Sequence, residues 1–175
     1  RIDGALNGSA SRPIHVAGNW INNGLFNHGD GIVVFCGDTS VSGSGVSYFK
    51  TIEITGNLDL NGSSVFVAGA WQQTGAFTAS GGSVVFNGDT AMTAPDNVQF
   101  GNLTIWGRLV APAGTINVAG DWINDGHFEH NNGTVNFNGN SRVYGTLWPV
   151  FGNVRVSGDL TGHDTQIVVQ GSWNA

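Results

Sequence analysis

The stretch "VAGNW" at residues 16–20 decides the fold, because it returns three times at a constant pitch. It reads "VAGAW" at 67–71, "VAGDW" at 118–122 and "VQGSW" at 169–173, each copy 51 residues after the one before. Full repeats therefore run over 14–64, 65–115 and 116–166, with the tail of a preceding repeat at 1–13 and a partial repeat at 167–175. Self-similarity at a fixed period, with no insertion or deletion, predicts one repeat-built domain over 1–175.

A smaller motif recurs inside each repeat: apolar, any residue, apolar, any residue, glycine. In the third repeat it reads "INVAG" at 116–120, "VNFNG" at 135–139 and "VRVSG" at 154–158, and successive starts lie 19, 19 and then 13 residues apart. Alternation of this kind predicts short strands with one buried face. We expect an all-β, single-stranded parallel β-solenoid, right-handed as parallel crossovers generally are, with two or three coils in each 51-residue repeat. A sandwich or propeller also uses short strands, but a strict register favours stacked coils.

The tryptophan of the motif shares its parity along the strand with valine and phenylalanine, which indicates core rather than a sugar-stacking surface. We expect internal ladders of identical residues, and we expect the glycine before each tryptophan to leave space for the indole. Asn22, Gln73 and Asn124 have the same parity and are expected to form a polar ladder. The expected apolar and glycine ladders comprise Val16, Val67, Val118 and Val169; Gly18, Gly69, Gly120 and Gly171; Trp20, Trp71, Trp122 and Trp173; Phe26, Phe77 and Phe128; Phe35, Phe86 and Phe137; and Phe49, Phe100 and Phe151.

Composition excludes several classes of partner. The formal net charge is −6, and the six Lys and Arg residues are scattered, so the chain has no basic patch for nucleic acid or an anionic membrane. No apolar run reaches membrane-spanning length, so we expect no membrane insertion. The single cysteine, Cys36, excludes an intrachain disulfide.

The sequence offers little chemistry that points to catalysis, and we expect no enzyme activity, no cofactor and no metal. The segment "HFEH" at 127–130 brings two histidines and a glutamate together, but it is absent from the other repeats and lacks further convergent ligands. Trp106 and Trp148 each occur in one repeat only and are the candidate surface contacts. Trp148 belongs to the window "TLWPV" at 146–150, which reads "SGVSY" at 44–48 and "PDNVQ" at 95–99. Such a window is either an unconstrained surface bend or a site of recognition.

The pattern "VAGxW…NxGxF…GxVxFNG…FxNLxIxG", which covers nearly the whole chain, resembles the repetitive β-helical segments of large bacterial surface proteins, such as filamentous haemagglutinin-like adhesins and autotransporter passengers. The resemblance implies an extracellular or cell-surface stalk, adhesin or fibre component. We therefore expect a structural rod that contacts neighbouring repeats of a longer chain or associates end to end with other copies. The alternative is an adhesin that binds glycans or a host surface through its variable outer residues. A carbohydrate-active enzyme is the third hypothesis.

Overall fold

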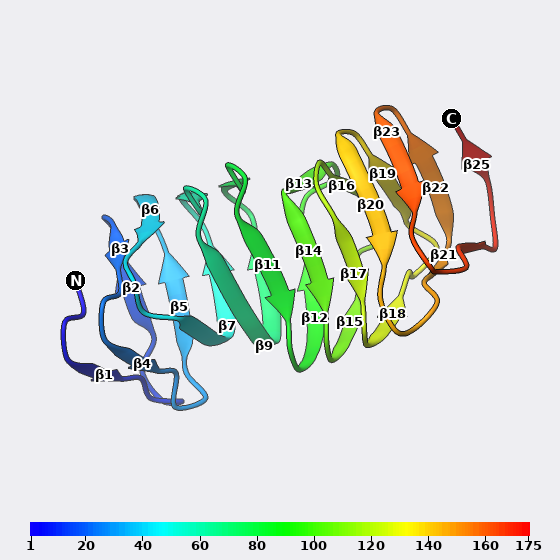
Figure 1. Ribbon diagram of the computed structural model, residues 1–175. Helices are drawn as coiled ribbons and strands as arrows, with labels where there is room; N and C mark the ends of the chain where they lie inside the picture. The colour runs from blue at the N-terminus through cyan, green and yellow to red at the C-terminus, as the bar shows by residue number, and fades with distance from the viewer.

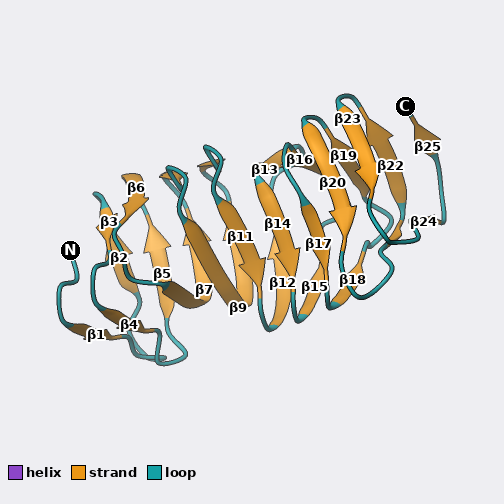
Figure 2. Cartoon of the chain, viewed as in Figure 1, coloured by secondary structure: helices purple, strands orange, loops and turns teal.

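The computed structural model describes residues 1–175 as an all-β chain without helices, coiled into a parallel β-solenoid of about nine turns. The turns follow one another along one axis, with the two termini at opposite ends (Figure 1), and short loops join the strands throughout (Figure 2). Paired strands of neighbouring turns run parallel, and partner residues lie between 18 positions apart, as for Ser47 and Val65, and 21 positions apart, as for Trp20 and Val41. One turn therefore takes about 19 residues.

Each turn crosses three faces, and nine strand segments stack on each face. Face 1 comprises β1 (Ala5–Asn7), β4 (Leu25–Asn27), the first halves of β7 (Ser47–Ile54) and β9 (Ser64–Gln73), β11 (Ser83–Phe86), β14 (Asn102–Ile105), β17 (Trp122–Asn124), β20 (Asn140–Tyr144) and β23 (Asp159–Gly162). Face 2 comprises β2 (Ile14–Val16), β5 (Ile32–Phe35), the second halves of β7 and β9, β12 (Asp89–Thr93), β15 (Arg108–Val110), β18 (His127–Glu129), β21 (Val150–Phe151) and β24 (Val168–Val169). Face 3 comprises β3 (Trp20–Ile21), β6 (Asp38–Ser42), β8 (Asn57–Asp59), β10 (Ala76–Thr78), β13 (Val98–Phe100), β16 (Thr115–Val118), β19 (Thr134–Phe137), β22 (Asn153–Val156) and β25 (Trp173–Asn174).

The sequence repeat and the structural turn have different lengths. Each 51-residue repeat holds eight strand segments, and three segments make one turn, so a repeat covers two and two-thirds turns. This value lies between the two and three coils that the sequence left open. It also explains the irregular steps, because each 19-residue step crosses three faces and the 13-residue step from Ile52 to Val65 crosses only two.

Successive repeats are consequently rotated by one face, and residues 51 positions apart do not stack. Trp20 lies on face 3, Trp71 on face 2 and Trp122 on face 1. Trp71 pairs with Ile52 and Met92, and Trp122 pairs with Leu103 and Val143. The predicted ladders of identical Val, Gly, Trp and Phe residues, and the Asn22, Gln73 and Asn124 ladder, are therefore wrong as columns. Equivalent residues of successive repeats would stack only if the repeat contained a whole number of turns.

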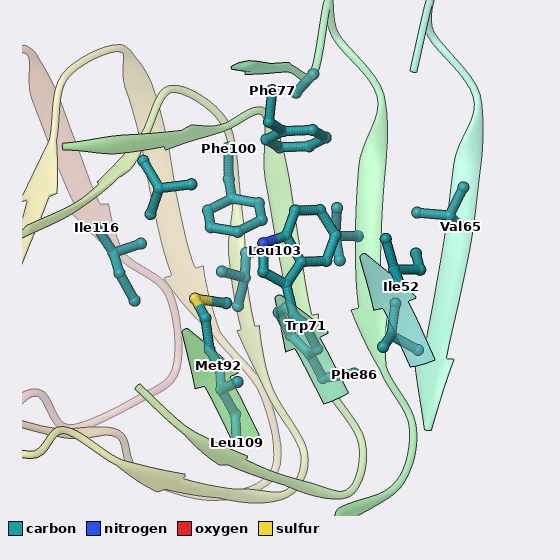
Figure 3. Packing of buried hydrophobic residues seen from close by; sticks show 14 of the residues in the cluster. Ile52, Val65, Trp71, Phe77, Phe86, Met92, Phe100, Leu103, Leu109 and Ile116 are labelled. Atoms are coloured by element: carbon teal, nitrogen blue, oxygen red, sulfur yellow. The ribbon is translucent and has the colours of Figure 1, made fainter. Parts of the chain in front are cut away.

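The alternate strand residues that were expected to point inward nevertheless form the core. Each repeat packs its own aromatic cluster there. Trp71 is fully buried, with ring centroids of Phe77, Phe86 and Phe100 at 4.8, 6.2 and 5.6 Å. Figure 3 shows these three rings around the indole. Equivalent clusters form around Trp20 with Phe26, Phe35 and Phe49, and around Trp122 with Phe128, Phe137 and Phe151. The edge-to-face contacts stabilise each cluster beyond the area that it buries.

The glycine before each tryptophan does not make room for the indole, which corrects the expectation from sequence. A Cβ on Gly120 would lie 2.2 Å from Asn102 Oδ1, and one on Gly171 would lie 2.5 Å from Asn153 Oδ1. These amide oxygens accept hydrogen bonds from the backbone N–H groups of Asp121 and Ser172. Gly120 and Gly171 thus give space to a capping asparagine of the preceding turn. A Cβ on Gly69 would instead lie 2.8 Å from the Lys50 carbonyl oxygen, and Gly18 has open space around its Cβ position.

Candidate functional site

A hollow with a volume of about 890 Å³ is lined by β18 and by the loop that joins β20 to β21. Figure 1 marks β18, β20 and β21 near the C-terminal end of the solenoid. We call this hollow the Trp148 groove. Two segments that the sequence singled out line it together: the variable window at 146–150 and the "HFEH" segment at 127–130. The window supplies Thr146, Leu147, Trp148 and Val150, and the last turn adds Val168 and Gln170.

The window takes a fixed path because the preceding turn holds its backbone and Thr146. Asn124 Nδ2 donates a hydrogen bond to the Leu147 carbonyl at 3.0 Å, and the Leu147 N–H donates to the Asn124 carbonyl at 3.0 Å. Asp125 Oδ1 accepts from the backbone N–H and the hydroxyl of Thr146 at 2.8 and 3.0 Å. These contacts leave the next side chain, Trp148, 63% exposed.

Two side chains of the "HFEH" segment, Glu129 and His130, have polar partners within the protein. Glu129 pairs with Arg108, which also donates to Asp89 Oδ1 at 2.9 Å, and the hydrogen bonds to Asp89 and Glu129 raise the pKa of Arg108 above its usual value. His130 Nδ1 accepts from the Asn132 N–H at 3.0 Å, so Nε2 is the ring atom that donates to Gln170 Oε1 at 3.1 Å. No group of three His, Cys, Asp or Glu side chains gathers to hold a metal ion, here or elsewhere.

A buried polar defect lies in the same repeat. Trp122 Nε1 and Asn124 Oδ1 are both inaccessible to solvent and have no hydrogen-bond partner. Asn124 is 2% exposed and lines the Trp148 groove. Sequence parity placed Asn124 inside the coil, but only the structure shows that it holds the window and leaves an acceptor free.

Trp106, the second candidate contact, lies elsewhere and has aromatic neighbours that the sequence did not suggest. Its ring centroid is 5.6 Å from that of Phe66, which in turn is 4.6 Å from that of Tyr48. Tyr48 and Phe66 are partners in the β7–β9 pair, one turn apart on face 1. The signal that could have found them is the spacing of one turn, 18 residues here, rather than the 51-residue repeat.

Comparison of the chain with protein-family models, curated proteins and solved structures finds no match. No helix long and apolar enough to cross a lipid bilayer is present. The fold and the Trp148 groove are therefore described from the structure of this chain alone.

Proposed function

We propose that this protein is a structural rod, a β-solenoid segment of an extracellular fibre or cell-surface stalk whose ends are covered by further solenoid turns. The observation that carries the proposal is the exposure of core positions at both ends. Trp173 is 48% exposed, whereas the equivalent Trp71 and Trp122 are fully buried. At the other end Leu6 and Ile14 are only partly buried. Apolar side chains of this size favour a covering layer, which either the next turns of a longer chain or a second copy supplies.

The backbone at the ends supports the same proposal. One edge of β25 pairs with β22 and the other has no strand beside it, and an open strand edge is a template for further pairing. A strand of face 1 follows β25 in the order in which the faces alternate, and either a longer chain or a second copy can supply it. Such added turns would continue the parallel pairing.

The distribution of residues around the rod also favours a structural role. Because successive repeats rotate by one face, each face presents different parts of the repeat in succession. A protein selected for one flat binding surface would instead repeat its exposed residues at a spacing of about 19 residues, the length of one turn. The low charge content and the Asn- and Gly-rich turns suit a location outside the cell, as does the resemblance to bacterial surface segments.

Electron microscopy and sedimentation velocity of the purified chain test the proposal. We expect filaments or short stacks whose length grows with protein concentration. Trp173→Asp should reduce stacking, because it places a charge on the exposed end, whereas Trp106→Asp on the side of the rod should leave stacking unchanged. Dispersed single rods at high concentration would contradict self-stacking and leave coverage by a longer chain as the remaining form of the proposal.

A further inference from the structure

Face 1 carries a row of mainly apolar side chains on its outer surface. Strand pairing places one outward-pointing residue from each of six successive turns next to that of the turn before. The row comprises Tyr48, Phe66, Val85, Thr104, Ile123 and Tyr144. The Trp106 indole lies beside it, with its ring centroid 5.6 Å from that of Phe66. We call these seven residues the face 1 stripe; with turns about 4.8 Å apart it is about 24 Å long.

The equivalent positions on the other two faces are mostly polar. Because successive repeats rotate by one face, residues 51 positions later form the same row on face 3, and residues 51 positions earlier form it on face 2. On face 3 the row reads Gln99, Asn117, Asn136, Arg155 and Asn174. On face 2 it reads His15, Val34, Glu53, Gln72 and Thr93. The coil therefore accepts polar residues at these positions, and the apolar row on face 1 is not a requirement of the fold.

The row on face 3 satisfies its own polar groups, whereas the face 1 stripe leaves large rings exposed. Asn136 Nδ2 donates to Asn117 Oδ1 at 2.7 Å, and Ser157 Oγ donates to Asn136 Oδ1 at 3.0 Å. On face 1, Tyr48 is 43% exposed and Trp106 is 54% exposed. A contiguous apolar surface of this kind on a soluble protein marks an interaction site.

The arrangement of the rings favours a protein partner over a sugar. The ring centroids of Tyr48 and Phe66 are 4.6 Å apart and their planes differ by 36°, so each ring covers much of one face of the other. A sugar stacks on a free ring face. The stripe also changes residue type from turn to turn, which suits packing against another irregular protein surface, where Tyr, Phe and Trp are enriched.

Charged residues near the two ends of the stripe indicate that this partner is a second copy. Lys50 directly follows the face 1 segment of β7 and forms no ion pair within the chain. Asp125 directly follows β17, and hydrogen bonds from Thr146 hold its carboxylate. Both therefore lie on the edge of face 1 where the strands end. A two-fold axis parallel to the strands brings this edge of two copies together and exchanges the ends of the stripe, so that opposite charges meet.

We propose that two copies of this protein pair side by side and antiparallel through the face 1 stripe. The Tyr48 end of each stripe covers the Tyr144 end of the other, and Lys50 of each copy pairs with Asp125 of the other. This inference does not rest on the proposed stacking of the rod, because it uses the side of the solenoid and not its ends.

Sedimentation equilibrium of the intact chain carrying Trp173→Asp, which should reduce stacking at the ends, tests the pairing. We expect a monomer–dimer equilibrium. Two stripe residues are then replaced by those of other repeats, Tyr48→Gln as at Gln99 and Trp106→Thr as at Thr55. This double variant should weaken dimerisation at least about tenfold, as expected for the loss of two aromatic anchors. Gln99→Ala, at the equivalent position on face 3, is the matched control and should leave dimerisation unchanged.

Exchange of the two charges tests the antiparallel arrangement. In the same background, Lys50→Glu and Asp125→Lys should each weaken self-pairing, because each brings like charges together at both contacts. An equimolar mixture of the two variants should dimerise again, since opposite charges then meet at both contacts. Circular dichroism checks that each variant is folded, and Lys50→Glu alone suffices if Asp125→Lys is not.

Three results would overturn the proposal. The first is a Trp173→Asp chain that stays monomeric at millimolar concentration. The second is a double stripe variant that dimerises as tightly as its parent. The third is dimerisation that Lys50→Glu leaves unchanged, or that a mixture of the two folded charge variants fails to restore.

Discussion

Trp20 and Trp173 lie on the same face of the solenoid, eight turns apart, although two equivalent tryptophans stand between them in the sequence. The return to one face after three repeats follows from a repeat of two and two-thirds turns. Each repeat therefore packs as a unit, because its aromatic cluster is formed from its own residues. Successive units are rotated by one face around the axis of the rod.

The backbones of neighbouring turns stack closely at some corners and not at others, so replacement of glycine by alanine should cost very different free energies of unfolding at two positions. A Cβ on Gly75 would lie 2.0 Å from the Gly56 carbonyl oxygen, whereas a Cβ on Gly18 meets nothing within 4 Å. Gly75→Ala should lower the free energy of unfolding by more than about 2 kcal/mol, because the clash is with backbone that has to shift. Gly18→Ala should change it by less than about 0.5 kcal/mol. Urea denaturation measures both, and a strongly destabilised Gly18→Ala would return that glycine to the role of making room for Trp20.

The indole hydrogen bonds predict unequal costs for one substitution at two equivalent positions. Trp71 and Trp122 are both fully buried, but only the Trp71 N–H has a protein partner. Trp71→Phe should destabilise the protein by about 1 kcal/mol more than Trp122→Phe, because it leaves the buried Gln73 carbonyl without its donor. Denaturation of the two variants under identical conditions checks this, and equal losses would show that the indole bond contributes nothing measurable.

Much of this architecture was predictable from sequence, because strand length, parity and the buried aromatic residues follow from local alternation. The strict 51-residue period predicted stacked coils, but it could not reveal the number of residues in a turn, which depends on how corners such as that between Phe49 and Thr51 bend. The ladders failed for that reason. Trp148 could be identified from the sequence because it occurs in one repeat only. The absence of a hydrogen-bond donor to Asn124 Oδ1 could not, because it depends on how far neighbouring side chains extend, which the alternation of residues does not reveal.

The ion pair between Asp121 and Arg142 predicts a dependence of stability on pH. Hydrogen bonds from Arg142, at 2.6 Å for the shortest, lower the pKa of Asp121 below its usual value. A carboxyl group with a lowered folded-state pKa stabilises the fold above its unfolded pKa of about 3.9, and this contribution is lost as the pH falls through the folded value.

Arg142→Ala should therefore lower the free energy of unfolding at pH 7, and the difference should vanish in acid once Asp121 is protonated. Arg155, which forms no ion pair, is the matched control, and Arg155→Ala should show no such convergence. Thermal unfolding between pH 7 and pH 2 measures both variants. A difference for Arg142→Ala that persists at pH 2 would assign its effect to packing instead.

The independence of the aromatic clusters predicts which deletions the rod tolerates. Removal of 65–115 takes out one whole repeat with its cluster, and it joins Ser64 to Ile116, which is equivalent to Val65. Every remaining residue keeps neighbours of the same kind, so the shortened chain should fold cooperatively, with stability reduced by one repeat and its interface. Removal of 84–102 takes out 19 residues, one full turn, but it deletes Phe86 and Phe100, whose rings pack against Trp71 and Phe77. We expect this smaller deletion to be the more damaging, with a lower unfolding midpoint and a broader transition by circular dichroism. A one-turn deletion more stable than the 51-residue deletion would show that the turn, rather than the sequence repeat, is the unit of packing.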